Sequence, residues 1–190
     1  MNEFEYRCSL NKKQYELVHE IINKDFVEKL QINYYYDTPD LFFDQQNTTV
    51  RIRQIEGLLK GTIKVHATDN ASRSIEESFG VETLPNVIRC GSKKLVCYGQ
   101  MITERKTWNM HKGITLMLDK NYYLGTVDYI LELEYPQIFQ EDADKIIKKL
   151  TKELGICFTK DNKSKRFFHL LKHIQEGSRN GIDIKYIEKH

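Results

Sequence analysis

Charged and apolar residues alternate along the first strand-like segment of the chain, residues 3–8. Successive side chains of a β-strand point to opposite faces, so Glu3, Glu5 and Arg7 would share one face and three apolar side chains the other. In a single half-buried strand, the charged face is ordinarily the one in contact with water. The pattern therefore becomes informative only if other strands repeat it.

The same period of two recurs along most of the chain, in segments rich in Ile, Val, Thr and Tyr. The connections between these segments are short, which favours antiparallel pairing. The segment 80–99 contains Pro85, Gly91 and Gly99, and it is predicted as a loop with room for one short helix. With residues 3–8, the predicted strands number eight and cover residues 31–37, 48–55, 58–67, 72–79, 100–109, 113–120 and 126–135.

Three segments show the period of three and four residues that is typical of amphipathic helices: residues 11–27, 141–154 and 162–176. Gly155 and Gly177 follow the last two segments and are predicted to end them. We therefore expect one domain over residues 1–176 and a C-terminal tail, free to fray, over residues 177–190.

The predicted strands carry a polar face with charges of both signs, while the helices have apolar stripes to bury. Both needs are met by an α+β fold in which an eight-stranded antiparallel barrel forms a tunnel with a charged interior and with helices packed outside. The alternative is a sheet whose charged face lies in water and carries surface ion pairs, and strand alternation alone leaves it open.

The charged side chains on the predicted inner face suggest a ligand. Arginine and lysine suit phosphate oxygens, and carboxylates without His or Cys partners are hard oxygen ligands suited to Mg²⁺ or Mn²⁺. A metal-bound polyphosphate needs both sets, and His66, beside Lys64, is a further candidate phosphate contact. The acids are Glu3, Glu5, Glu76, Asp119, Glu132 and Glu134, and the bases are Arg7, Arg51, Arg53, Lys64 and Arg105.

Composition argues against several classes of protein. The formal net charge is +2, from 29 basic and 27 acidic side chains, so the chain lacks the general basic character of a nucleic-acid-binding protein. It contains no long apolar run for a membrane span, no secretory signal, and no Cys spacing typical of zinc sites. We expect a cytoplasmic protein, a monomer or homodimer, whose partner is a small phosphorylated substrate rather than a membrane or a nucleic acid.

An ordered set of short motifs resembles the CYTH superfamily, the triphosphate tunnel metalloenzymes. The resemblance covers about residues 2–172, and its basic segment 162–168 is similar to one found in the bacterial branch. The other motifs are Glu3-x-Glu5-x-Arg7, Tyr35-Tyr36-Asp37-Thr38-Pro39, Val50-Arg51-Ile52-Arg53, Thr62-Ile63-Lys64, Leu118-Asp119 and Leu131-Glu132-Leu133-Glu134.

The resemblance implies a tunnel that binds a triphosphate through basic residues and a divalent metal through carboxylates. It implies Mg²⁺ or Mn²⁺ as the cofactor, and roles in catalysis for Glu5, Arg7 and Glu132. The metal ligands would be drawn from Glu3, Glu5, Glu76, Asp119, Glu132 and Glu134, and the phosphate contacts from Arg7, Arg51, Arg53, Lys64, Arg105, Lys163 and Arg166.

One position departs from the family pattern, which usually has Lys where this chain has Arg7. Arginine keeps the charge but is larger, forked and unable to lose its proton. Three functions therefore remain open. The first is metal-dependent hydrolysis of a triphosphate, the second is the reaction of a class IV adenylate cyclase, and the third is binding of a polyphosphate or nucleotide without turnover.

Overall fold

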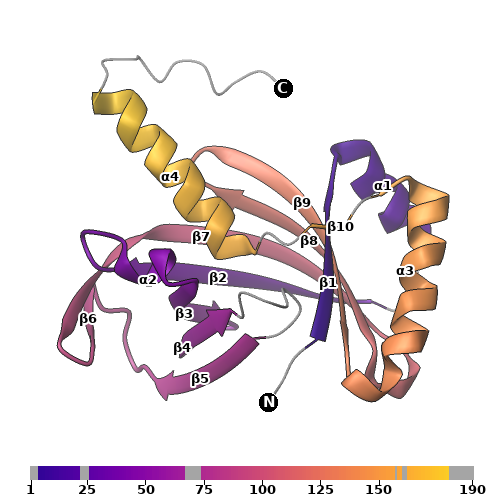
Figure 1. Ribbon diagram of the computed structural model, residues 1–190, viewed down its shortest axis with the longest axis horizontal. Helices are drawn as coiled ribbons and strands as arrows, with labels where there is room; N and C mark the ends of the chain where they lie inside the picture. Colours follow the sequence, from indigo (N-terminus) through magenta and orange to yellow (C-terminus); the bar gives the residue numbers. More distant parts are fainter. Residues whose placement is uncertain (1–3, 22–25, 67–73, 157, 160–161, 180–190) are drawn as a thin grey trace.

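The computed structural model describes residues 4–21, 26–66, 74–156, 158–159 and 162–179. Within these residues, ten strands form one strongly curled antiparallel sheet in the order β10-β1-β9-β8-β7-β2-β3-β4-β5, with β6 paired to β7 (Figure 1). The strands are β1 (Phe4–Leu10), β2 (Val27–Asp37), β3 (Thr48–Ile55), β4 (Leu58–His66), β5 (Ser74–Gly80), β6 (Val87–Cys90), β7 (Lys93–Asn109), β8 (Thr115–Tyr123), β9 (Thr126–Tyr135) and β10 (Phe158–Thr159).

In the described part of the chain, four α-helices accompany the sheet: α1 (Lys12–Ile21), α2 (Phe42–Gln45), α3 (Gln140–Leu154) and α4 (Lys163–Arg179). Two short 3-10 turns, η1 (His111–Gly113) and η2 (Gln137–Phe139), precede β8 and α3. None of the helices in the described part of the chain has the length and apolar character needed to cross a bilayer. The predicted fold is confirmed, because all eight predicted strands are present in a curled antiparallel sheet.

The prediction of a loop over residues 80–99 was wrong. Strand β7 runs for 17 residues from Lys93, and β6 pairs with its first part through the two-residue connection 91–92. Gly91 has a φ of 58°, the left-handed conformation that a tight hairpin turn requires and that glycine adopts without strain. The hairpin covers the outer face of β2 and β3, where Leu95 packs against Tyr36 and Ile52.

Two predicted helix ends were also wrong. Helix α1 ends at Ile21 and β2 begins at Val27, so the predicted helix does not reach residue 27. Gly177 lies inside α4, which continues to Arg179. Glycine in a helix interior costs only about 1 kcal/mol relative to alanine, which helical neighbours readily offset. The expected tail beyond residue 179 lies outside the described residues.

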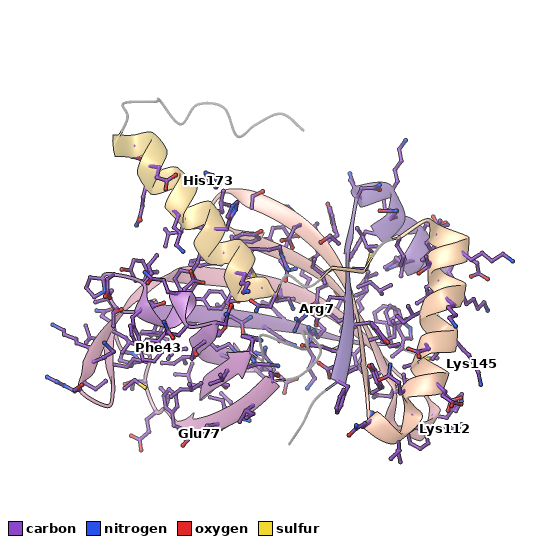
Figure 2. All side chains as sticks on the ribbon, in the orientation of Figure 1. Arg7, Phe43, Glu77, Lys112, Lys145 and His173 are labelled. Carbon is purple, nitrogen blue, oxygen red and sulfur yellow. The ribbon has the colours of Figure 1, made fainter. Side chains whose placement is uncertain are left out.

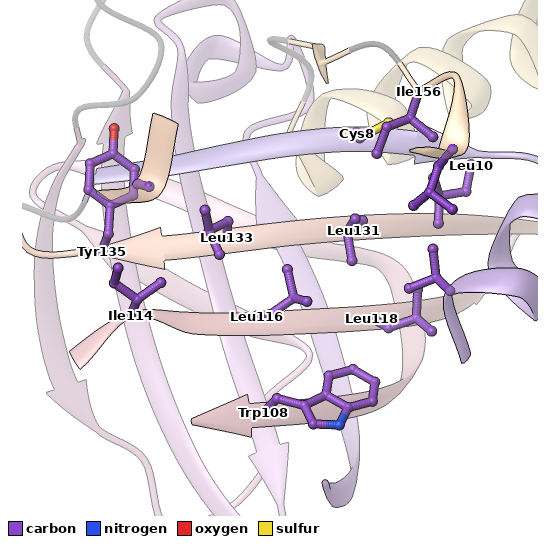
Figure 3. Close-up of a cluster of buried hydrophobic side chains, with 13 residues drawn as sticks. Cys8, Leu10, Trp108, Ile114, Leu116, Leu118, Leu131, Leu133, Tyr135 and Ile156 are labelled. Atoms are coloured by element: carbon purple, nitrogen blue, oxygen red, sulfur yellow. The ribbon is translucent and has the colours of Figure 1, made fainter. Parts of the chain in front are cut away.

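The largest hydrophobic core lies on the outer face of β1, β9 and β8, under α1 and α3 (Figure 3). Leu131 and Leu133 of β9 belong to this core, whereas their neighbour Glu132 faces the other side of the sheet. Val18 of α1 and Ala143 of α3 are fully buried against it. The alternation that defined the strands therefore separates an apolar outer face from a charged inner face.

Helix α4 occupies a different place from α1 and α3. Its Phe167 packs on Tyr35, with 4.8 Å between the ring centroids, and in the same cluster lie Met101 and Tyr123. By strand parity, these three residues share the face of the charged side chains, so α4 covers one end of the concave face. Tyr35 is fully buried in this cluster and also lines the concave face beside the charged residues.

The contact between β4 and β5 provides a test of the sheet register. Gly61 and Phe79 are cross-strand partners, and a methyl group added at Gly61 would lie 2.1 Å from the Phe79 ring. We expect Gly61→Ala to lower the free energy of unfolding by about 1–3 kcal/mol, because the ring must leave its place. Gly80→Ala is the control, since nothing lies within 4 Å of its added methyl group. Equal urea midpoints for the two variants would contradict the register.

Candidate functional site

The concave face of the sheet encloses a charged cavity of about 310 Å³. Its described lining carries seven basic side chains and four carboxylates, so the cavity has an excess of positive charge. Every strand from β1 to β5, together with β7, β9 and the start of α4, contributes to it. The lining consists of Glu5, Arg7, Tyr35, Thr49, Arg51, Arg53, Lys60, Lys64, His66, Glu76, Arg105, Glu132, Glu134, Asn162, Lys163 and Ser164.

Glu132 is the centre of an ion-pair network. Its Oε1 atom lies 3.3 Å from Nε of Arg7 and 3.8 Å from Nζ of Lys163, and its Oε2 atom lies 2.5 Å from Nη2 of Arg105. Burial alone would raise the pKa of this carboxyl group. The charges of Lys163, Arg105 and Arg7 outweigh that effect and hold the pKa well below its usual value, so Glu132 is ionised.

Arg105 forms a fork-like pair with Asp119, its cross-strand partner on β8, which is fully buried. Its Nε and Nη2 atoms each donate to a carboxylate oxygen at 2.7 Å, and Lys163 also donates to Asp119. Burial lowers the pKa of Arg105, but the charges of Asp119 and Glu132 raise it overall. For Lys163, burial and the charge of Arg105 dominate, and the pKa is lowered.

Arg7 joins the two carboxylates expected to act in catalysis. Its Nη2 atom lies 2.5 Å from Oε1 of Glu5, and its Nε atom donates to Glu132. The pairing of β1 with β9 produces this geometry, because Arg7 is opposite Glu132 and Glu5 is opposite Glu134. Arg7 lies near the centre of the molecule (Figure 2). A substitution at this position therefore bears directly on both carboxylates.

A second group of bases comes from β3 and β4, on the opposite wall. Glu76 of β5 lies 3.8 Å from Arg51 and 3.9 Å from Lys64, distances that leave the contacts loose. Arg53 donates to the side-chain oxygen of Asn33 at 2.9 Å. Burial, together with the charges of Arg51 and Arg105, lowers the pKa of Arg53 to about 9. Among the described residues, Nε of Arg51 is a buried donor without a hydrogen-bond partner.

A chain of hydroxyl and amide groups attaches α4 to this wall. Thr49 Oγ1 lies 3.2 Å from Nε2 of His66 and 2.5 Å from Oγ of Ser164. Oδ1 of Asn162 accepts from the Ser164 hydroxyl at 2.7 Å and from the backbone N–H of Lys165 at 2.9 Å. The bond to the N–H of Lys165 is the one that an N-cap residue makes. The side chain of Asn162 therefore caps the start of α4 and also holds it against the cavity.

Of the predicted site residues that the structure describes, all but Asp119 and Arg166 line this cavity. Asp119 is buried beside Arg105 and Lys163, and Arg166 donates from Nε to Asp128 at 2.8 Å. Glu3 lies outside the described residues. Sequence reasoning missed two kinds of residue. Lys60 lies on the same strand face as Lys64, and Thr49 on the same face as Arg51, so the alternation along these strands could have predicted both. Asn162 and Ser164 act through the start of α4, which strand alternation does not describe.

The carboxylates suit a metal that is bound together with its substrate. Within the described residues, no three acidic, His or Cys side chains converge closely enough to hold an ion by themselves. Glu5 and Glu134 are cross-strand neighbours on the cavity wall, beside Glu132. Mg²⁺ is usually bound by one or two carboxylates, substrate phosphates and water. This donor set therefore fits such an ion when the substrate supplies the remaining oxygen ligands.

The model of the CYTH domain matches residues 1–168. The chain belongs to the CYTH domain family. Its sequence is 24% identical over 171 residues to YjbK of Bacillus subtilis (strain 168), which is named as a candidate triphosphatase; the match covers 81% of this chain and 87% of YjbK.

Solved structures of CYTH-like proteins share the fold. One, from Bacillus halodurans and described as a candidate adenylate cyclase, has a TM-score of 0.69 at 23% identity, covering 87% of this chain and 97% of that one. Another, from Hippeastrum, is described as a candidate adenylyl cyclase with a dominant triphosphatase activity. It has a TM-score of 0.64 at 19% identity, covering 100% of this chain and 99% of that one. At these sequence identities, the similarity to the two solved structures shows the fold of this chain and no more.

His66 provides a pH test of the cavity's electrostatics. Burial and the charges of Lys64, Arg7 and Arg51 lower the pKa of its imidazole to about 3, so the folded chain keeps it neutral. The unfolded chain protonates this ring below about pH 6.5, so stability falls as pH decreases from 7 to 5. We expect His66→Gln, whose amide can still bond to Thr49, to reduce this loss by about 1–2 kcal/mol in urea titrations at both pH values. An equal loss of unfolding free energy between pH 7 and pH 5 in the wild-type protein and in His66→Gln would contradict a neutral His66.

Proposed function

We propose that this CYTH protein hydrolyses a linear triphosphate in the charged cavity, with Mg²⁺ or Mn²⁺ bound to the carboxylates of β1 and β9. The observation that carries the proposal is the cavity lining, which combines seven bases with four carboxylates: Arg51, Arg53, Lys60 and Lys64 come from β3 and β4, and Glu5, Glu132 and Glu134 come from β1 and β9. A triphosphate has several negative charges in a row, and a cavity with excess positive charge compensates them.

The wall formed by β3 and β4 is suited to the phosphate groups. Arg51 has a buried Nε donor without a partner among the described residues, and its contact with Glu76 is long. Arg53 pairs with an amide rather than a carboxylate. These guanidinium groups therefore have donors to offer to phosphate oxygens without first breaking a strong ion pair. They would also stabilise the charge that develops on the transferred phosphoryl group.

The wall formed by β1 and β9 is suited to the metal. Glu5, Glu132 and Glu134 provide hard oxygen atoms, and Arg7 and Arg105 now neutralise two of them. When a triphosphate binds, these guanidinium groups can turn to phosphate oxygens and leave the carboxylates to coordinate an ion. A bound divalent ion would polarise the phosphoryl oxygen and lower the pKa of a bound water. Glu132, ionised at neutral pH, is suited to orient the attacking water.

The names of the relatives agree with this proposal in general terms. YjbK is named as a candidate triphosphatase, and the Hippeastrum protein is described by a dominant triphosphatase activity. The candidate cyclase from Bacillus halodurans indicates the alternative reaction for the same fold. ATP separates the two, since a hydrolase releases orthophosphate from it and a cyclase releases pyrophosphate and cyclic AMP.

A substrate panel tests the proposed reaction. Tripolyphosphate, thiamine triphosphate and ATP would each be incubated with Mg²⁺, with Mn²⁺ and with chelator, and the products separated by chromatography. We expect orthophosphate from at least one substrate in the presence of either metal, and none with chelator, because the carboxylates act through the ion. Activity that persists in chelator would contradict the role of the carboxylates.

Variants of the acidic wall test the site itself. We expect Glu5→Gln and Glu132→Gln each to lower kcat at least about a hundredfold, the scale of losing one strong electrostatic contribution to a transition state. Glu77→Gln is the matched control, because Glu77 is exposed on β5 and points away from the sheet's charged face (Figure 2). Full activity in both wall variants would contradict the assignment, whatever the control does.

Binding without turnover is the second candidate function, and the position of Arg7 favours it. This guanidinium contacts both Glu5 and Glu132, so it competes with a metal for the same oxygens. Calorimetry that finds tight binding of tripolyphosphate, with no phosphate release under either metal, would support this function. Arg7→Lys then distinguishes the two cases, since the shorter, single-point charge should restore turnover if Arg7 blocks the metal.

A further inference from the structure

A second cavity, of about 450 Å³, lies between α2 and the first turns of α4. Asp44 of α2 and Asn47, just after it, form one side. The side chains of α4 that face it are Lys165, Arg166, His169 and Lys172. Arg166 was expected to contact phosphate in the first cavity, and the proposed hydrolysis assigns no role to the other residues that line this one.

The second cavity adjoins the first. The backbone N–H of His66, which lines the first cavity, donates to the carbonyl of Asn47, which lines the second, at 3.0 Å. On α4, Lys163 and Ser164 line the first cavity and the next residue, Lys165, lines the second. Burial and the surrounding cations, Lys165 among them, lower the pKa of His66, which agrees with Lys165 lying close to the first cavity.

The second cavity also has an excess of positive charge, with three bases and one carboxylate in its described lining. Asp44 holds Lys172 at 2.7 Å, and Asp128, outside the cavity, holds Arg166 at 2.8 Å. These ion pairs fix the two cations in place. Lys165 is exposed and makes no ion pair within the described residues, so its charge is available to a ligand at the boundary between the cavities.

The lining is better suited to phosphate than to an organic group. Among the described residues that line the second cavity, the imidazole of His169 is the only aromatic ring, and it is already in edge contact with His173, so the cavity offers little aromatic surface on which a nucleobase could stack. Apart from the Asp44 carboxylate, its polar groups are ammonium, guanidinium, amide and imidazole groups, which donate hydrogen bonds to anionic oxygens.

We propose that this second cavity binds part of a linear polyphosphate. The first three phosphate groups of that ligand lie in the first cavity, and the phosphate groups that follow them lie in the second. Lys165 contacts the polyphosphate at the boundary between the two cavities. The proposal rests on the proposed function to the extent that a triphosphate unit occupies the first cavity. It predicts that the protein discriminates polyphosphates by length, and that residues of α4 outside the first cavity set this preference.

The test compares affinities for tripolyphosphate, tetrapolyphosphate and longer linear polyphosphate by calorimetry in chelator, where a metal-dependent hydrolase does not turn over. Lys165→Gln should weaken binding of the longer chains about fivefold relative to tripolyphosphate, the scale of one partly exposed charge contact, and Lys165→Glu should weaken it further. Lys145→Gln is the matched control, an exposed lysine of α3 far from both cavities (Figure 2).

The ratio of the affinity for a longer polyphosphate to the affinity for tripolyphosphate decides the outcome. A ratio that falls in the Lys165 variants and stays constant in Lys145→Gln supports the second cavity. A ratio that is unchanged in all variants, or that falls equally in Lys145→Gln, overturns it. Phosphate release is measured separately with Mg²⁺, so wild-type protein that binds by length but releases nothing contradicts the proposed hydrolysis and leaves the second cavity supported.

Discussion

The structure depends on one electrostatic constraint, the burial of Glu132 among Arg7, Arg105 and Lys163. Isolated charges cannot be removed from water without a large cost, so these residues fold only as a set. Glu132 connects β9 to β1, to β7 and to α4, and Asp119 of β8 completes the set. Each member has at least two partners, so loss of one would weaken the compensation of several buried charges at once, and the charged face and the fold cannot vary independently.

The same constraint explains the arrangement of the layers. Helices α1 and α3 bury the apolar outer face of β1, β8 and β9, which frees the concave face for polar residues (Figure 1). Helix α4 closes one end of that face with Phe167 and begins at Asn162, inside the cavity. Its first turn therefore serves two cavities, and the chain of bases continues from Lys163 to Lys165 across their boundary.

Strand parity was the part of the structure that the sequence predicted best. It placed Arg51, Arg53 and Glu132 on one face because a sheet with a buried apolar side fixes its register. It did not predict the hairpin of β6 and β7, whose turn is only two residues long and is marked in the sequence by Gly91 alone. It also did not predict that Arg166 pairs with Asp128 of a distant strand. Contacts between a helix and a sheet depend on how the two are docked, and no local pattern in the sequence records that geometry.

The central claim is that the concave face is built to be completed by a polyanion. Urea unfolding in chelator, with and without tripolyphosphate, tests it most directly, because a ligand that binds the folded state alone stabilises it by about 2.7 kcal/mol at a hundred times its Kd. We predict that tripolyphosphate raises the free energy of unfolding of the wild-type protein, and that this increase is largely lost in the double variant Arg51→Gln, Arg53→Gln. An unfolding midpoint of the wild-type protein that tripolyphosphate leaves unchanged would contradict the account.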